Sequence, residues 1–188
     1  MAPSRPDRAA SEDLDRILFA NARIAVGSFR CAPQDGRFHD SGPIQNDIVV
    51  FPRTSVRIRH EGDRPFVADP SLATIYNRGQ RYTREAVAPE GDRCTWLAVE
   101  RGIALEIARR VDPEAAAAPE RPFRFPFGPT PSALCLRERL LTARLRSGEP
   151  VEELEVEEEV LSLAEAVLVE ARACFTGPRA PSASTAFE

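Results

Sequence analysis

Five side chains among residues 57–96 are of types that recognise small molecules: Arg57, His60, Tyr76, Tyr82 and Trp96. A guanidinium can bind a carboxylate through two parallel hydrogen bonds. Tyrosine and tryptophan each offer an apolar ring with one polar atom. Because small-molecule sites combine apolar walls with a few placed polar groups, these five residues are our candidate ligand-binding set.

The same residues also allow a purely structural interpretation. Trp96 and the two tyrosines can belong to an ordinary core, Arg57 can lie on a solvated outer face, and His60 can be a satisfied histidine at the end of a strand. Which side chains point inward depends on strand register, and a shift of one residue inverts the whole set. The sequence therefore leaves both interpretations open.

Residues for metal or nucleophilic catalysis are sparse. Two histidines are present, His39 and His60. The four cysteines form no CxxC pair: Cys31, Cys94, Cys135 and Cys174. Metal sites usually have closely spaced ligands, and the sequence also contains no GxSxG elbow and no glycine-rich phosphate loop. We therefore expect reduced thiols, no metal, no cofactor, no catalytic residues and no enzymatic activity.

Charge and hydropathy limit the partners of the chain. The 188 residues carry a formal net charge of -4, whereas proteins that bind nucleic acids on their own usually have a basic footprint. Residues 1–16 are polar and charged, unlike a signal peptide, and no apolar run reaches the roughly 18–20 residues of a membrane span. We expect a cytoplasmic protein that binds neither DNA nor a membrane by itself.

Short runs of β-branched and aromatic residues recur between turns from residue 22 to about residue 99. Residues 47–51 form a continuous apolar run, which is typical of a strand buried on both faces. Residues 55–60 alternate strictly, with Val56, Ile58 and His60 on one face. Regularly spaced short strands without a βαβ rhythm predict a β-sandwich or a small barrel.

The second half of the sequence changes character. Residues 112–131 contain six prolines together with Phe123, Phe125 and Phe127, which predicts an extended connector that buries these rings on the barrel. Apolar residues at helical spacing then predict two antiparallel helices within residues 132–176, with Thr130 as the N-cap of the first and Gly148 at its end.

Four segments in the β-rich half resemble the N-terminal domain of AraC-family transcription regulators: residues 47–60, 66–70, 76–82 and 91–96. Many relatives carry a Pro-Gly-x-x-His turn that leads into an inward-facing residue. Here the corresponding turn reads Arg-Gly-Gln-Arg-Tyr at residues 78–82, with tyrosine in place of histidine. The similarity extends over roughly residues 20–175, and the order of the segments is its strongest part.

The resemblance implies an α+β fold, mainly β, in which a cupin-like double-stranded β-helix barrel is followed by a C-terminal antiparallel helical hairpin. We accordingly predict disordered tails at 1–12 and 177–188, a barrel at 13–111, a connector at 112–131 and a helical hairpin at 132–176. The family also carries a pair of helix-turn-helix motifs that reads DNA. Eleven residues follow Gly177, so we expect this DNA-binding domain to be absent from the chain.

The apolar stripe on the predicted hairpin has to be covered by the barrel or by a second subunit. We expect a homodimer, with these interface residues: Leu134, Leu141, Leu145, Val160, Leu163 and Val167. The leading hypothesis is a regulatory module that dimerises and senses a small-molecule effector. The alternative is a stand-alone cupin-fold small-molecule-binding protein or enzyme.

Overall fold

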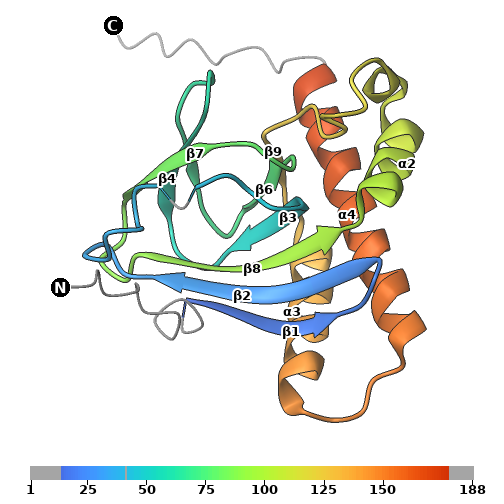
Figure 1. Cartoon of the computed structure of the whole chain (residues 1–188), viewed down its shortest axis with the longest axis horizontal. Coiled ribbons are helices and arrows are strands. Elements are labelled where there is room, and N and C mark those ends of the chain that lie inside the picture. The colour runs from blue at the N-terminus through green and yellow to red at the C-terminus, as the bar shows by residue number, and fades with distance from the viewer. Residues whose placement is uncertain (1–13, 41, 178–188) are drawn as a thin grey trace, which may run out of the picture.

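Two antiparallel sheets and a layer of helices make up the described part of the chain, residues 14–40 and 42–177. Figure 1 shows this computed structural model, with the helices gathered beside the larger sheet. A β-rich unit followed by C-terminal helices confirms the predicted fold class. The predicted tails, apart from Gly177, lie outside the described residues.

The larger sheet has six strands in the order β1-β2-β8-β3-β6-β9, and the smaller sheet has three in the order β5-β4-β7. The strands span β1 Asp15–Ala20, β2 Ile24–Cys31, β3 Asp47–Pro52, β4 Val56–His60, β5 Phe66–Ala68, β6 Leu72–Tyr76, β7 Tyr82–Ala86, β8 Asp92–Val99 and β9 Phe127–Pro129. All paired strands are antiparallel.

Strands β3 and β4 follow the burial predicted from their sequences. Strand β3 pairs with β8 on one side and β6 on the other, and five of its six residues are buried. In β4 the side chains of Val56, Ile58 and His60 are buried, whereas Arg57 and Arg59 are exposed. Beyond its first residue, Asp47, strand β3 is apolar, which suits its position between the helices on one face of its sheet and the small sheet on the other.

Four helical segments lie outside the sheets: α2 Arg101–Val111, the short 3-10 helix η1 Pro113–Ala117, α3 Ser132–Ser147 and α4 Glu153–Thr176. Helix α2 differs from the prediction, which places residues 101–111 in the barrel. Its buried face has the helical spacing Ala104, Ile107, Ala108 and Val111. The Glu100 side chain accepts a hydrogen bond from the Ile103 amide and caps the helix. This helical spacing is visible in the sequence, but it directly follows the residues of strand β8.

Helices α3 and α4 form the predicted antiparallel hairpin. Arg137 pairs with Glu159 and Arg144 with Glu155, so residue numbers rise along α3 as they fall along α4. Gly148 ends α3 in the left-handed conformation with φ 75°, as predicted. The predicted N-cap is wrong, since α3 begins at Ser132 without a side-chain cap and the Thr130 hydroxyl donates to the Pro70 carbonyl instead.

The connector is extended only in part, since it begins with η1, and its rings contact α4 as well as the barrel. Phe123 is buried, and Phe125 and Phe127 are half-buried. Strand β9 extends the large sheet by pairing with β6. Gly128 in β9 lies directly under α4, since a Cβ atom there would come within 2.8 Å of the Ala171 amide nitrogen. The connector thereby joins the last strand to the last helix.

Candidate functional site

A cavity of about 340 Å³ lies between the two sheets. This volume is near the lower end of the range of small-molecule pockets. Because alternate residues of a strand share one face, each strand contributes every second side chain to the wall. The strand residues that line it are Ile48, Val50 and Pro52 of β3, Val56 and Ile58 of β4, Ala68 of β5, Thr74 and Tyr76 of β6, Tyr82 and Arg84 of β7, and Asp92, Cys94 and Trp96 of β8, with Phe29 of β2.

The floor and the rim of this cavity differ in exposure. Most of the wall residues are buried, whereas Asp15 and Ile17 of β1 and the loop at residues 42–46 also line it and are largely exposed. We call this set, Asp15, Ile17 and residues 42–46, the mouth. A ligand would therefore enter past β1 and this loop and would reach an apolar interior.

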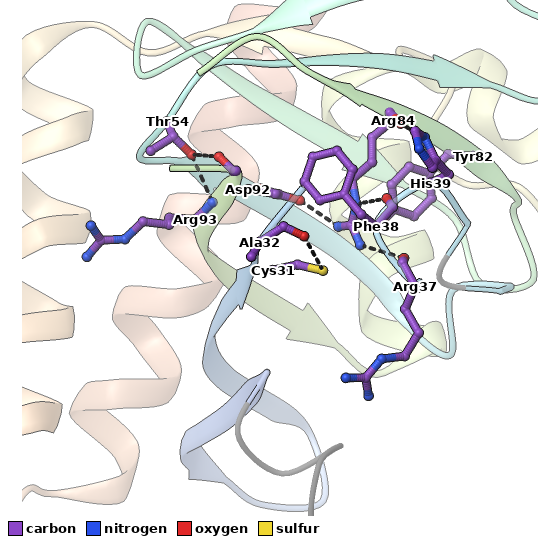
Figure 2. A network of polar contacts seen from close by, with 11 residues as sticks. Cys31, Ala32, Arg37, Phe38, His39, Thr54, Tyr82, Arg84, Asp92 and Arg93 are labelled. Carbon is purple, nitrogen blue, oxygen red and sulfur yellow. Dashed lines mark hydrogen bonds and ion pairs between the residues drawn. The ribbon is translucent and has the colours of Figure 1, made fainter. Parts of the chain in front are cut away.

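A buried ion pair lies in the wall. Arg84 Nη1 is 2.6 Å from Asp92 Oδ2, and the Arg84 side chain is 1% exposed. Arg84 also donates from Nε to the Phe38 carbonyl at 2.5 Å and from Nη2 to the Arg37 carbonyl at 3.2 Å. Figure 2 shows the guanidinium between Asp92 and this loop backbone. The pair thus fixes the segment at 37–38 against strands β7 and β8.

Burial dominates the electrostatics of the wall. It raises the pKa of the Asp92 carboxyl, although the neighbouring Arg84 guanidinium lowers it in part. Burial also raises the pKa values of the Tyr76 hydroxyl and the Cys94 thiol well above their usual values. Tyr76 and Cys94 are consequently neutral at physiological pH, and the charge in the wall is confined to the Arg84–Asp92 pair.

Trp96 connects the wall to the mouth. Its indole Nε1 donates to Asp15 Oδ1 at 2.7 Å. Its ring lies over Gly27, the residue opposite it on β2, where a Cβ atom would come within 2.2 Å of the ring. Glycine at this position is what lets the indole lie flat against the sheet.

His60 lies behind the wall. It is 1% exposed, and its ring centroid is 4.7 Å from that of Tyr76 and 5.6 Å from that of Phe66. Its Nε2 has no hydrogen-bond partner among the described residues. Burial lowers the pKa of His60 to about 4, so the ring is neutral at physiological pH.

The structure brings together three of the five candidate ligand residues. Tyr76, Tyr82 and Trp96 line the cavity, and His60 contacts Tyr76 without lining it. Arg57 does not line this cavity: its side chain is 54% exposed on the outer face of β4, 3.7 Å from Glu85. Arg57 alternates with the inward-facing Val56 and Ile58, so it points away from the cavity.

Arg84 and Asp92, the charged residues of the wall, are not among the residues predicted from the sequence. The alternation along β7 contained the signal for Arg84, because it lies two residues after the inward-facing Tyr82. A buried arginine is rare without a partner, and its partner Asp92 lies across a turn on the next strand. Only the folded arrangement identifies the two as a pair.

The six residues predicted for a dimer interface are used within the chain. Leu134, Leu141, Val160, Leu163 and Val167 are buried, and Leu145 is partly buried against the same core. The prediction that these side chains face a second subunit is therefore wrong at the level of residues. The large sheet and α2 cover the apolar stripe of the hairpin. This agrees with the other possibility given by the sequence, that the barrel covers the stripe.

The described residues contain no group of three or more His, Cys, Asp or Glu side chains placed to hold a metal ion. Cys31 and Cys94 are buried, Cys135 is half-buried and Cys174 is exposed, all as free thiols. Across residues 14–40 and 42–177, no helix has the length and apolar character needed to cross a membrane.

The sequence matches no protein-family model and no curated protein. Among solved structures, apo ToxT from Vibrio cholerae aligns with a TM-score of 0.52 at 7% identity, over 78% of this chain and 54% of that chain. A second Vibrio cholerae ToxT structure gives 0.48 at 8% identity, over 74% and 54%. A Bordetella pertussis cupin domain gives 0.36 at 15% identity, over 46% and 92%.

The fold is cupin-like. It resembles the N-terminal region of ToxT, an AraC-family regulator, and this likeness at 7% identity concerns the fold alone. The chain spans about half the length of ToxT, 54%.

Proposed function

We propose that this chain is a ligand-sensing and dimerisation module of a transcription regulator. The observation that carries the proposal is the cavity of about 340 Å³ between the sheets, with apolar walls and a few placed polar groups. It lies in a fold that resembles the N-terminal region of an AraC-family regulator. The proposal assigns binding to the cavity and no catalysis, and it leaves DNA recognition to a separate domain.

A buried contact offers a route from the cavity to the helices. Arg53 follows the wall residue Pro52 and donates from Nη2 to both carboxylate oxygens of Glu138 on α3, at 2.7 and 2.6 Å. Glu138 is fully buried and also accepts from the Thr142 hydroxyl. A ligand that displaces the β3 end of the wall would therefore act on α3 through a charge-assisted contact.

The dimerisation part of the proposal uses a second copy of the chain on the outer face of α3. Leu136 and Leu140 are 57% and 60% exposed and lie one helical turn apart. A twofold pairing of α3 with its copy would cover both leucines with their own counterparts. Because α3 also holds the Glu138 contact, cavity occupancy and dimer geometry would be linked.

The binding function is tested by screening small molecules for an increase in melting temperature, which a ligand specific for the folded state produces. The stabilising compounds are then applied to Ile48→Phe, which fills the cavity from β3, and to Val67→Phe on an exposed position as the matched control. We expect Ile48→Phe to lose the stabilisation and Val67→Phe to keep it. Stabilisation that survives in Ile48→Phe would place the ligand elsewhere.

The dimer is tested by light scattering at micromolar concentration. We expect a dimeric mass for the wild type, a monomeric mass for the double variant Leu136→Glu and Leu140→Glu, and a dimer for the exposed control Val87→Glu. A monomeric wild type overturns the dimer but leaves the ligand-binding proposal in place.

A further inference from the structure

The charges around the cavity limit what it can bind. Among the described residues that line it, Arg84 is the only cation, whereas Asp15 and Asp92 are carboxylates. The neighbouring arginines Arg30 and Arg93 are opposite each other on β2 and β8, and strand alternation places them on the other face of the sheet. An entering anion would therefore depend on Arg84 for a counter-charge.

Arg84 is already fully engaged. Its Nη1 pairs with Asp92, and its Nε and Nη2 donate to the carbonyls of Phe38 and Arg37. The rings of Phe29 and Phe38 lie 4.7 and 5.2 Å from its guanidinium carbon. An anion could bind Arg84 only by displacing Asp92 or the loop carbonyls, which would leave a buried carboxylate or carbonyl unpaired.

The mouth adds a negative charge that no cation of the wall balances. Asp15 accepts from Trp96 Nε1, a neutral donor, while the Arg84–Asp92 pair is neutral as a whole. Asp15 is exposed at the mouth, yet partial desolvation of its carboxyl raises its pKa, against the opposing effect of the hydrogen bond from Trp96. A cationic ligand at the mouth would stabilise the ionised form of Asp15, and an anionic ligand would be repelled by it.

The aromatic side chains favour the same ligand charge. Phe29, Tyr76, Tyr82 and Trp96 line the cavity, and the Tyr76 and Tyr82 rings lie 4.9 Å apart. Aromatic faces attract cations and tolerate neutral apolar groups, and Trp96 lies beside Asp15 at the mouth. A ligand with an apolar body and a cationic end can therefore place the body against the rings and the charge near Asp15.

We propose that the cavity selects against anions and takes a mainly apolar small molecule that is cationic or uncharged, in that order of affinity. The inference rests on the proposed ligand-binding function and adds the chemical class of the ligand. It ranks carboxylates and phosphates of similar size below cationic and uncharged ligands.

The test compares three compounds with one apolar body at neutral pH: 1-adamantanemethylamine, 1-adamantanemethanol and 1-adamantanecarboxylate. Trp96 is the single tryptophan of the chain and lines the cavity, so its fluorescence reports binding at this site. We expect the amine to bind about tenfold or more tightly than the carboxylate, with the alcohol between them.

Two variants assign the selectivity to the mouth. Asp15→Asn removes the carboxylate at the mouth, and Glu85→Gln removes one from the outer face of β7. We expect Asp15→Asn to reduce the preference for amine over carboxylate to about threefold or less, and Glu85→Gln to leave it unchanged. An equal reduction in both variants would mean that overall charge, not the mouth, sets the preference, and would overturn the inference.

Failure of this inference and failure of the proposed function give different results. A carboxylate that binds as tightly as the amine overturns the ligand class and leaves the binding function standing. If all three compounds leave the Trp96 fluorescence and the melting temperature unchanged at millimolar concentration, the binding function itself is contradicted, and the ligand class with it.

Discussion

The two faces of the six-stranded sheet are built from alternate residues of the same strands, yet they differ in kind. Toward the helices, Val49, Leu97 and Ile75 join a continuous apolar core with α2, α3 and α4. Toward the small sheet, Val50, Trp96 and Tyr76 surround a cavity and a buried ion pair. The first face is filled by side chains and supports the fold, whereas the second keeps open volume and fixed charges.

This difference shows how the alternation of a strand can separate stability from binding. A filled apolar face loses both transfer free energy and packing contacts when a side chain is shortened. The wall of a cavity already lacks neighbours on one side, so it loses less from the same change. The cavity face depends instead on polar partners, because a buried charge without its partner is costly.

The largest effect is expected from Arg84→Leu on the cavity face. The change leaves Asp92 without its ion pair and the carbonyls of Arg37 and Phe38 without their donor. We expect the free energy of unfolding to fall by roughly 3–5 kcal/mol, measured by urea denaturation. The double variant Arg84→Leu and Asp92→Leu should recover part of this loss. A double variant no more stable than the single one would show that the loop contacts, not the charge pair, account for the loss.

The helix face is tested by Leu163→Ala, at a fully buried position of α4. We expect a loss of roughly 3–4 kcal/mol, because the surrounding core cannot close the gap completely. Ile58→Ala, at a buried position in the cavity wall, should cost roughly 1–2 kcal/mol, because it extends an existing cavity. Equal losses in the two variants would mean that both faces are equally well filled.

A pH titration of stability sharpens the comparison at His60. Burial, with a smaller contribution from Arg121, lowers its pKa to about 4 from the usual 6.5, against the opposing charge of Asp63. The unfolded chain therefore takes up the proton first as the pH falls. Stability should decrease from about pH 6.5 to about pH 4, by roughly 3 kcal/mol in total.

The matched variant for this titration is His60→Phe, which keeps a ring against Tyr76 and Phe66. In this variant the free energy of unfolding should no longer show the decrease between pH 6.5 and pH 4 that protonation of His60 causes. Chemical denaturation across that range measures both proteins. A variant curve parallel to the wild-type curve would assign the dependence to other groups.

The smallest effect is expected from Gly27→Ala. The added methyl group would come within 2.2 Å of the Trp96 ring, so the indole has to move from its place over β2. We expect a cost of roughly 1–2 kcal/mol and a shift in the emission of Trp96. Gly36→Ala, in open space, serves as the control and should change neither. Unchanged Trp96 emission in Gly27→Ala would mean that the indole does not depend on this glycine.

Local pattern in the sequence determined much of the β-rich half. The alternation in residues 55–60 and the continuous apolar run at 47–51 predicted the burial of β4 and β3, because strand periodicity is a local property. The order of short strands also predicted the fold class. Three of the five candidate ligand residues, Tyr76, Tyr82 and Trp96, line the cavity for the same reason.

Tertiary structure alone decided the remaining points. The covered face of the hairpin depends on which surfaces meet in the fold, because a one-dimensional pattern shows an apolar face without showing what covers it. The partnership of Arg84 with Asp92 joins two strands across a turn, and the carbonyls that complete it come from the segment at 37–38. The sequence thus determined which side chains alternate inward, and the packing of two sheets decided which inward face is filled and which is hollow.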